Sequence, residues 1–398
     1  MDGRDSKIKL MSKKQLGQFF TTNSDYILAG LEKFIAGKEV TDPFVGGGDL
    51  IVWAKKNKAK NTRGFDVDTK LVDNVSNFYN DSLANPQDYK FVLTNPPYLN
   101  VNKATKETKE KYFKNHSFED LYQISLASIM NSDEGIVIVP INFLSAENSE
   151  KIRKAFFSKF KIVQMNYFKH QVFEDTTYNV IAFYYKKTDK PLNFFSIETH
   201  VYPENKLINI ELSRKFNWAI GGEHLNDVKE QKNLLNIYRL TEGQIENGPK
   251  KIAAAHNHIK SKRFVNVSDS FRNLVESNLI LLRAIDSGTE EGKIRLENIK
   301  KYNVECLISK PSSRNMVYLV FNNRITLEEQ LKLIELFNKE INNLRENYLS
   351  LFLTNFRDND RKRISFDFVY KLLNYLYFKQ VKPISRLQPG LEYNLGAI

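Results

Sequence analysis

The tetrapeptide Asn95-Pro96-Pro97-Tyr98 contains the residues whose types most clearly suggest a reaction. It follows an apolar run at residues 91–94 that is typical of a strand, and its two prolines would hold the backbone in a rigid, extended turn. An amine on an aromatic ring is a poor nucleophile because its lone pair is delocalised. A carboxamide oxygen and a nearby backbone carbonyl can accept both amine hydrogens and so localise the lone pair for attack on a methyl sulfonium. The alternative interpretation is a plain proline-rich exit from a strand.

Upstream, a glycine-rich turn and acidic residues follow other predicted strands. In the turn at residues 42–48, DPFVGGG, the glycines Gly46 and Gly48 would let the backbone approach a ligand closely, and Asp42 could neutralise an ammonium group. Asp66 follows the next strand, where a carboxylate can accept both hydroxyls of a ribose. The turn could hold a nucleotide phosphate instead, although no Lys-Ser/Thr pair follows it as in a P-loop. Each acid taken singly could be an ordinary cap or turn residue, and we expect Asp68 to cap a helix.

Together these motifs resemble those of amino-methyltransferases that methylate N6 of adenine in DNA with S-adenosylmethionine. The resemblance implies that Asn95 and Pro96 belong to the catalytic loop and that Tyr98 offers a flat surface for an extruded base. Residues 16–22, LGQFFTT, resemble the motif that folds over the methionine portion of the cofactor, with Thr22 in place of the usual proline. This motif precedes the glycine-rich turn, so the order is similar to that of the gamma type, with the catalytic half first.

The resemblance assigns roles to further residues. Asp81 resembles the acid that accepts the adenine amino group of the cofactor, and a helix beginning near Leu121 resembles an element that lines that adenine. The segment at residues 172–181, VFEDTTYNVI, resembles the one whose aromatic packs on the flipped base; we assign Phe173, with Tyr178 as the competing choice. The catalytic set implied is Asn95, Pro96, Tyr98 and Phe173, without a metal. The cofactor-binding set implied is Phe20, Thr21, Asp42, Phe44, Gly46, Gly48, Asp66, Asp81 and Asn95.

Alternating apolar runs and amphipathic stretches must position these residues. Strands are predicted at residues 39–41, 62–65, 91–94, 135–140, 162–167 and 180–185, and helices at residues 24–34, 50–57, 118–130 and 148–157. This alternation favours an α/β fold with a doubly wound parallel sheet, whose ligands lie at the carboxyl ends of the strands. The resemblance implies a Rossmann-like S-adenosylmethionine-dependent methyltransferase sheet.

A change in the pattern of predicted elements after residue 190 indicates a second domain. The charged, proline-ending segment at residues 186–191, KKTDKP, suggests a catalytic methyltransferase domain at residues 1–190 and a target-recognition domain at residues 191–398. We expect the second domain to be mixed α+β and largely helical. The long helical stretch is predicted at residues 326–378, where apolar residues such as Leu331, Ile334 and Phe337 recur at three- and four-residue spacing.

The charge of the chain suggests a polyanionic partner. Its 398 residues include 59 Lys and Arg against 47 Asp and Glu, a net charge of +12, with +4 on residues 1–189 and +8 on residues 190–398. Alternatively, the basic residues could lie on solvated helix faces and, at residues 99–118, in a mobile lysine-rich loop, without binding a polyanion. The residues predicted to bind DNA are Lys103, Lys106, Lys260, Lys262, Arg263, Arg361 and Arg363.

The single cysteine limits the methyl-transfer reactions that this chain could catalyse. Cys306 lies in an apolar, strand-like run far from the motifs, which excludes a cysteine-dependent attack on the cytosine ring as well as internal disulfides. Methylation of cytosine N4 stays open as a minor alternative. An RNA adenine methyltransferase and a protein-glutamine methyltransferase share the Asn-Pro-Pro-Tyr loop, but the glutamine enzyme would place a helical domain before the cofactor loop. A catalytically silent DNA-binding subunit would not need the intact loop.

The remaining expectations concern location and partners. No run of about 18 apolar residues occurs, and the polar N-terminus lacks the apolar stretch of a signal peptide. We therefore expect a cytoplasmic protein without membrane association. The resemblance implies double-stranded DNA as the substrate and a restriction-modification role, with a separately encoded restriction endonuclease as the partner.

Overall fold

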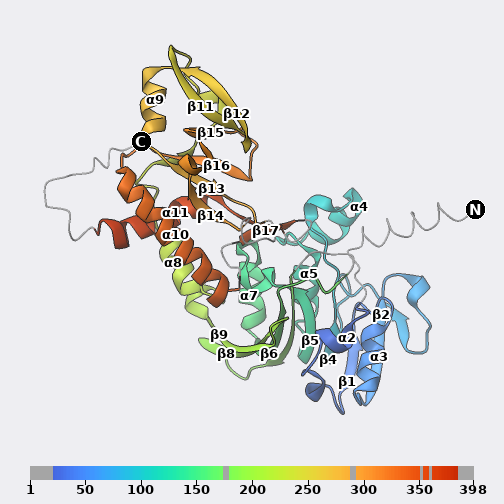
Figure 1. Ribbon diagram of the computed structural model, residues 1–398. Helices are drawn as coiled ribbons and strands as arrows, with labels where there is room; N and C mark the ends of the chain where they lie inside the picture. The colour runs from blue at the N-terminus through green and yellow to red at the C-terminus, as the bar shows by residue number, and fades with distance from the viewer. Residues whose placement is uncertain (1–20, 174–178, 287–292, 350–352, 358–360, 384–398) are drawn as a thin grey trace, which may run out of the picture. The chain divides into compact units, whose positions relative to one another are not determined.

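The computed structural model describes residues 21–173, 179–286, 293–349, 353–357 and 361–383 (Figure 1). The chain divides into two compact units, Met1–Gly222 and Glu223–Ile398. Each unit has its own sheets and its own helices, and the pocket described below lies in the first.

The first unit is built on one nine-stranded sheet in the order β3-β2-β1-β4-β5-β7-β6-β8-β9. Its strands are β1 (Glu39–Asp42), β2 (Asn61–Asp66), β3 (Asn77–Tyr79), β4 (Tyr89–Thr94), β5 (Ser132–Pro140), β6 (Phe160–Phe168), β7 (Val180–Lys187), β8 (Phe194–Tyr202) and β9 (Lys206–Ser213). The neighbours from β3 to β5 all pair in parallel, whereas β7 is antiparallel to both β5 and β6, and β9 to β8. The expected α/β class is confirmed, and the sheet is mixed rather than purely parallel.

Short helices connect these strands. They are α2 (Ser24–Ile27), α3 (Asp49–Lys56), α4 (Lys106–Thr108), α5 (Leu121–Ser128), α6 (Asn142–Ser145) and α7 (Glu150–Phe157), with a 3-10 turn η3 (Val101–Lys103) and a π-helical turn η4 (Lys109–Phe113). The start of α5 is set by a capping box, in which Asp120 and Gln123 bond reciprocally to each other's backbone N–H groups. This cap places Leu121 at the first helical position, later than the predicted start at residue 118.

The order of the strands reverses between β1 and β4. From β1 the chain builds β2 and β3 towards one edge, and from β4 it builds β5 towards the other. β1 ends at Asp42 and β4 at Thr94, and the Thr94 hydroxyl donates a hydrogen bond of 2.7 Å to Asp42 Oδ1. Ligands of doubly wound sheets bind in the crevice at such a reversal, because the loops leave in opposite directions there. The sheet therefore brings the two main motifs of the sequence to one place.

The first unit extends beyond the predicted boundary at residue 190. The β8–β9 hairpin joins the same sheet, since β8 pairs in parallel with β6. Alternate residues of β8, among them Phe195 and Ile197, are buried, and Phe195 and Phe157 pack against the ring of Trp218 at centroid distances of 5.4 and 5.5 Å. The segment after residue 190 thus completes the first core, and the unit ends at Gly222.

The second unit combines three small sheets with helices, in the orders β10-β16-β13-β14, β12-β11-β15 and β17-β18. Its strands are β10 (Ile237–Arg239), β11 (Lys250–His256), β12 (His258–Val267), β13 (Ile280–Arg283), β14 (Arg295–Asn298), β15 (Cys306–Ile308), β16 (Met316–Phe321), β17 (Leu353–Arg357) and β18 (Arg361–Ile364). Its helices are α8 (Gly222–Lys229), α9 (Asp269–Glu276), α10 (Leu327–Asn347) and α11 (Phe366–Leu376). It is mixed α+β, with a larger share of strand than the expected largely helical domain.

The predicted helical stretch at residues 326–378 is interrupted. α10 begins at a capping box between Thr326 and Glu329 and buries a stripe that includes Leu333 and Phe337, while Leu331 is 43% exposed. The β17–β18 hairpin then separates α10 from α11. The continuous helix was therefore a wrong prediction, because helical spacing on either side says nothing about a strand pair formed between them.

Within the described ranges, no helix combines the length and the apolar character that crossing a membrane requires.

Candidate active site

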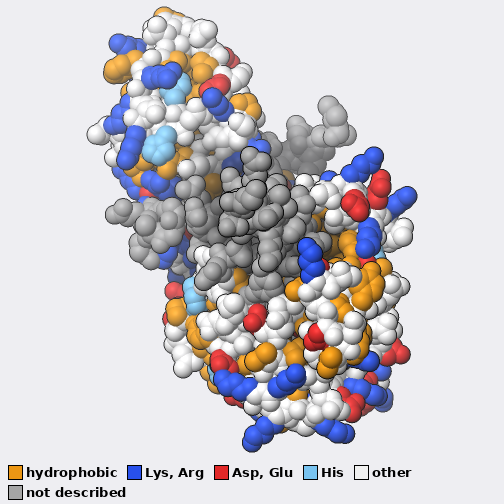
Figure 2. All heavy atoms as spheres, turned by 90° about the vertical axis from the view of Figure 1, so that its right-hand side faces the viewer, with side chains coloured by type: hydrophobic (Ala, Val, Ile, Leu, Met, Phe, Trp, Pro, Cys, Tyr) orange, Lys and Arg blue, Asp and Glu red, His pale blue; other side chains and the backbone are white. Residues whose placement is uncertain are grey.

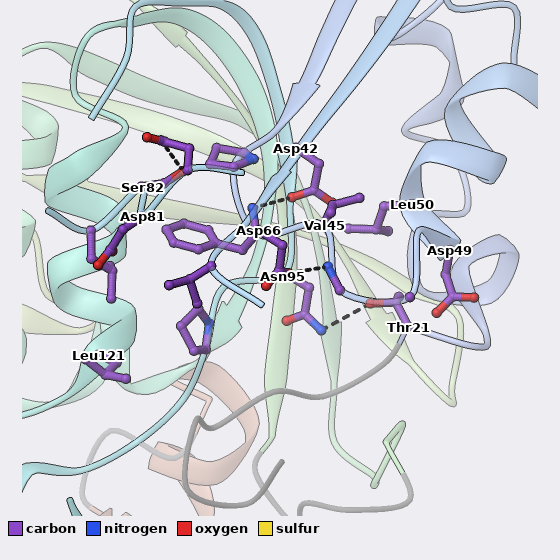
Figure 3. A pocket seen from close by; sticks show the side chains of 18 of the residues that line it. Thr21, Asp42, Val45, Asp49, Leu50, Asp66, Asp81, Ser82, Asn95 and Leu121 are labelled. Carbon is purple, nitrogen blue, oxygen red and sulfur yellow. Dashed lines mark hydrogen bonds between the residues drawn. The ribbon is translucent and has the colours of Figure 1, made fainter. Parts of the chain in front are cut away.

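A single pocket in the first unit collects most of the residues that the sequence singled out (Figure 3). It lies where β1, β2 and β4 end, and it holds about 770 Å³ of empty space, open solvent at its mouth included. Seven residues of the expected cofactor set line it: Thr21, Asp42, Phe44, Gly46, Asp66, Asp81 and Asn95. Gly48 does not line the pocket; it caps α3 with a φ of 83°, a conformation that favours glycine. Phe20 lies outside the described residues.

Asp42 is the most buried acid of this pocket, with 1% of its surface exposed. Its Oδ1 accepts hydrogen bonds from Thr94 Oγ1 at 2.7 Å and from the Phe44 backbone N–H at 3.0 Å. Its Oδ2 has no hydrogen-bond partner among the described residues. Burial raises the pKa of Asp42 to about 7. A cationic group in the pocket would satisfy the open oxygen and favour the ionised carboxylate.

Asp66 joins the glycine-rich turn to the end of β2. Its Oδ2 accepts a hydrogen bond from the Gly46 N–H at 2.9 Å, and its Oδ1 accepts one from the Asp68 N–H at 2.8 Å. Burial raises the pKa of Asp66 above its usual value. A carboxylate has about four lone-pair sites, so Asp66 can still accept a hydroxyl hydrogen from a ligand. Asp68 caps a short 3-10 turn through its bond to the Lys70 N–H, which confirms the predicted cap.

Asp81 has two partners that the sequence did not reveal. The Tyr112 hydroxyl donates to Asp81 Oδ2 at 3.0 Å, and Lys111 Nζ lies 2.7 Å from the same oxygen. Tyr112 lines the pocket and packs in one apolar cluster with Leu121 and its neighbours. The lysine-rich segment was predicted to contact DNA phosphates or solvent. The aromatic pair Tyr112-Phe113 among its lysines was the signal that part of it is buried.

The Asn-Pro-Pro-Tyr loop follows β4, and the side-chain amide of Asn95 has a hydrogen-bond partner at each end. Asn95 is 8% exposed and lines the pocket; its Nδ2 donates to Thr21 Oγ1 at 3.1 Å, and its Oδ1 accepts from the Tyr98 hydroxyl at 2.5 Å. The Tyr98 hydroxyl also lies 2.8 Å from the Ile138 carbonyl oxygen on β5. Pro96 is buried beside Asn95 and, unlike Pro97, does not line the pocket.

The two aromatics expected to hold an extruded base are both buried. Tyr98 is 6% exposed and Phe173 is 4% exposed, and neither is among the residues that line the pocket. Burial raises the pKa of Tyr98 far above its usual value. The competing aromatic, Tyr178, lies outside the described residues. Stacking by Tyr98 or Phe173 therefore stays a prediction, and this structure does not present either ring face to the pocket.

The basic residues predicted to bind DNA lie in both units. Lys103 on η3 and Lys106 on α4 are exposed. Arg361 and Arg363 are in the strand β18 rather than in a helix; Arg363 is half-buried, and the side chain of Arg361 is outside the described atoms. The other three, Lys260, Lys262 and Arg263, lie close together in sequence on the edge strand β12, and all three are exposed.

The β11–β12 hairpin is the most one-sidedly charged part of the second unit. Residues 250–267 contain five Lys and Arg and no Asp or Glu. Phe264 of β12 is 71% exposed, and Lys251 Nζ lies 4.5 Å from the centre of its ring. The face of this unit seen in Figure 2 shows blue Lys and Arg side chains with few red acidic ones between them. Lys250 pairs with Asp269 at 3.4 Å. An exposed aromatic among side chains that carry charge of one sign is suited to a nucleic acid.

The first unit is an α/β domain whose pocket lies where the strand order reverses. Acidic side chains and the buried carboxamide of Asn95 line this pocket, as expected for a ligand-binding site. Residues 8–173 match the family model described as Eco57I restriction-modification methylase. This part of the chain is therefore similar to methylases of the restriction-modification type. The match includes the glycine-rich turn and the Asn-Pro-Pro-Tyr loop, and it ends at Phe173.

Several solved structures resemble part of the chain. A modification subunit assigned to a type I restriction enzyme of Vibrio vulnificus YJ016 is 15% identical, with a TM-score of 0.38, over 56% of this chain and 55% of that one. The type I methyltransferase subunit from Streptococcus thermophilus is 16% identical, with a TM-score of 0.33, over 49% and 50%. A protein described as an RNA methyltransferase from Pyrococcus horikoshii is 18% identical, with a TM-score of 0.33, over 48% and 98%. The chain thus spans about half the length of the two subunits, and no curated protein matches it.

Proposed function

We propose that this chain is a DNA methyltransferase of a restriction-modification system that transfers a methyl group from S-adenosylmethionine to N6 of adenine. One observation carries the proposal. A single pocket holds both a buried carboxylate with an open oxygen, Asp42 Oδ2, and the carboxamide of Asn95 in the Asn-Pro-Pro-Tyr loop. The methylase match of residues 8–173 supports it.

The lining of the pocket fits the parts of S-adenosylmethionine. Asp42 would hold the cationic methionine end, because its unpartnered oxygen lacks a counter-charge among the described residues. Asp66 would accept the ribose hydroxyls with the lone pairs that the backbone leaves open. Asp81 would accept the adenine amino group, and the apolar side chains that could enclose the adenine ring are Val67, Leu83 and Leu121.

The carboxamide of Asn95 would act on the target amine. Its Oδ1 and the Pro96 carbonyl would accept the two N6 hydrogens, which draws the nitrogen towards tetrahedral geometry and localises its lone pair. Bound S-adenosylmethionine would supply an electrophilic methyl group, so that the nitrogen forms the new N–C bond, the sulfur keeps the electron pair of the broken bond, and a proton leaves to water. Asn95 would need no covalent intermediate with the base.

The second unit would hold the DNA. We assign Lys260, Lys262 and Arg263 of the β11–β12 hairpin to duplex contacts, together with Lys103 and Lys106 of the first unit, because all five are exposed. Cys306 is not suited to attack a cytosine ring: it is fully buried in the second unit, and burial raises the pKa of its thiol to about 12. In a restriction-modification system the partner of such an enzyme would be a separately encoded restriction endonuclease.

The test is direct product analysis. The full chain is incubated with unmethylated duplex DNA and isotopically labelled S-adenosylmethionine, and the DNA is digested to nucleosides for mass spectrometry. Labelled N6-methyl-2′-deoxyadenosine is the expected product, and Asn95→Ala should not form it. A product limited to N4-methylcytosine, or label found only in RNA or in protein offered in parallel, would overturn the proposal.

A further inference from the structure

We propose that Lys111 and Tyr112 are positioning residues that hold the carboxylate of Asp81 in the pocket, and that they thereby set the selectivity of the pocket for a base with an exocyclic amine. The inference rests on the proposed function, since it concerns the acid assigned to the adenine of S-adenosylmethionine. It is carried by the contacts of Asp81 and by the place of Tyr112 in the pocket wall.

Asp81 is a buried acid that receives two side-chain donors on one oxygen. Its side chain is 9% exposed, Lys111 Nζ lies 2.7 Å from Oδ2, and the Tyr112 hydroxyl donates to the same oxygen at 3.0 Å. An ionised carboxylate has no hydrogen to give, so the lysine and the tyrosine must be the donors in both contacts. The hydrogen bond to Asp81 raises the pKa of Lys111 above its usual value, so the ammonium stays charged beside the carboxylate.

The other oxygen of Asp81 is less strongly held. Oδ1 accepts a hydrogen bond from the Ala84 backbone N–H at 3.3 Å, longer than the usual separation of about 2.9 Å. A carboxylate can accept about four hydrogen bonds, and Asp81 lines the pocket. The carboxylate can therefore accept one further hydrogen from a ligand while Lys111 and Tyr112 keep their bonds to Oδ2.

The two donors are consecutive residues of the π-helical turn η4 (Lys109–Phe113). A bond of 3.1 Å from the Lys114 N–H to the Lys109 carbonyl oxygen, five residues earlier, closes this turn. Consecutive residues of a regular α-helix do not face each other, yet in this turn both side chains reach one carboxylate oxygen. Turns of the π type are rare and occur frequently at functional sites.

The ring of Tyr112 forms part of the pocket wall. Tyr112 is 9% exposed and lines the pocket together with Leu83 and Leu121, and the three side chains pack in one apolar cluster. Phe113, the next residue, is buried in the same cluster. This packing keeps the Tyr112 hydroxyl beside Asp81, so the carboxylate is oriented before a ligand arrives. An acceptor that is already ordered loses less conformational entropy when the ligand binds.

An oriented carboxylate distinguishes bases by the group at position 6. The exocyclic amine of adenine can donate a hydrogen to Asp81, whereas purine carries only a C–H group there. Purine would therefore leave the carboxylate without a ligand donor after water has been displaced. A hydrogen bond to a charged group corresponds to about 10- to 100-fold in affinity, which is the selectivity expected of this pocket.

Calorimetry of the full chain with two ligands tests this selectivity. The ligands are S-adenosylhomocysteine and its analogue with purine in place of adenine, and the wild type should bind the first at least about tenfold more tightly. Tyr112→Phe keeps the ring and removes the hydroxyl. It should weaken the binding of S-adenosylhomocysteine by about fivefold and leave the binding of the purine analogue unchanged, because only adenine uses the oriented carboxylate.

Three outcomes for Tyr112→Phe would overturn the inference. Equal weakening of both ligands would mean that Tyr112 serves only as a wall of the pocket. Unchanged binding of both ligands would mean that its hydroxyl does not orient Asp81. Tighter binding of S-adenosylhomocysteine would mean that the hydroxyl competes with the adenine amine for Asp81.

Lys111→Met tests the second donor, and Lys109→Met is its matched control. Lys109 is an exposed lysine of the same turn, so both variants remove one positive charge from η4. Lys111→Met should lower the ratio of the two affinities by about fivefold, because Asp81 loses one of its donors. Lys109→Met should keep the wild-type ratio. Equal changes in both variants would mean that the charge of the turn, rather than the bond to Asp81, explains the selectivity.

Binding and methylation separate this inference from the proposed function. If the wild type binds S-adenosylhomocysteine with the expected selectivity but methylates no DNA, the proposed function fails and the role of Lys111 and Tyr112 stands. If the wild type methylates DNA but binds both ligands equally well, the inference alone is overturned.

Discussion

The pocket of the first unit and the β11–β12 hairpin of the second unit use polar side chains in opposite ways. In the pocket, Asp42, Asp66 and Asn95 are at least nine-tenths buried, and each is held by specific hydrogen bonds at distances of 2.5 to 3.1 Å. On the hairpin, Lys260, Lys262 and their neighbours are exposed and carry charge of one sign. A buried polar side chain of the pocket loses its effect when one hydrogen-bonding atom is removed, because water cannot replace the lost partner there. The exposed charges of the hairpin act through a summed field that salt weakens.

The largest effect is expected at the pocket, from Asn95→Ala. Removing the carboxamide leaves the amine without its side-chain acceptor, so the methylation rate should fall by about 1,000-fold. The Kd for S-adenosylmethionine, measured by calorimetry, should change little, because Asp42, Asp66 and Asp81 remain in place. Near-normal turnover of duplex DNA by Asn95→Ala would show that the catalytic assignment is wrong.

Asp42 should make cofactor binding dependent on pH. Because its pKa in the empty pocket is about 7, the carboxyl is protonated at lower pH, and the Kd for S-adenosylmethionine should rise by about tenfold for each pH unit below 7. Asp42→Asn should weaken binding by about 10- to 100-fold and remove this pH dependence. Calorimetry from pH 5.5 to pH 8.5 measures both, and an unchanged slope in the variant would contradict the role of Asp42.

Asp42 should affect the stability of the empty protein in the opposite direction: low pH weakens cofactor binding but stabilises the fold. The folded-state pKa is raised from 3.8 to about 7, so Asp42 contributes stability that is fully present below pH 4 and is lost as the pH rises through 7. Asp42→Asn should therefore raise the melting temperature of the empty protein at pH 8. A lower melting temperature at pH 8 would indicate that Asp42 is stabilised by a partner.

The hairpin should respond more weakly and in a salt-dependent way. The double variant Lys260→Glu/Lys262→Glu should lower the affinity for duplex DNA by about tenfold and reduce the slope of log K against log salt by about 2. Lys332→Glu/Lys339→Glu on α10 makes the same change in net charge at exposed positions of the same unit. Fluorescence anisotropy at several salt concentrations compares them, and equal losses in both pairs would mean that net charge alone explains binding.

The smallest effect is expected from Phe173→Ala. If the ring packs on the extruded base, capture of that base should weaken by about fivefold, near the lower limit for one base–aromatic stack. The measurement is 2-aminopurine fluorescence together with the KM for DNA. Unchanged kinetics would remove Phe173 from the site.

Much of the first unit could be predicted from short strand-like runs between helical stretches. The predicted strands at residues 39–41, 62–65 and 91–94 lie within β1, β2 and β4, of which β4 is buried at all but one position and is the clearest apolar run. The meeting of the motifs in one pocket followed from the same pattern, since parallel strands end at one edge. The strand β3 (Asn77–Tyr79) was missed because none of its residues is fully buried, so that it lacks an apolar run.

The Asn-Pro-Pro-Tyr loop shows where local sequence stops being informative. Residue types alone established a carboxamide in a rigid turn, because prolines restrict the backbone whatever surrounds them. Only the tertiary structure placed the Tyr98 hydroxyl between Asn95 and Ile138, and Tyr112 against Asp81. These contacts join residues from different elements, and a side chain has several rotamers among which only packing selects. Composition and spacing therefore determined which groups this protein brings to its pocket, while the folded core decided the direction in which each one points.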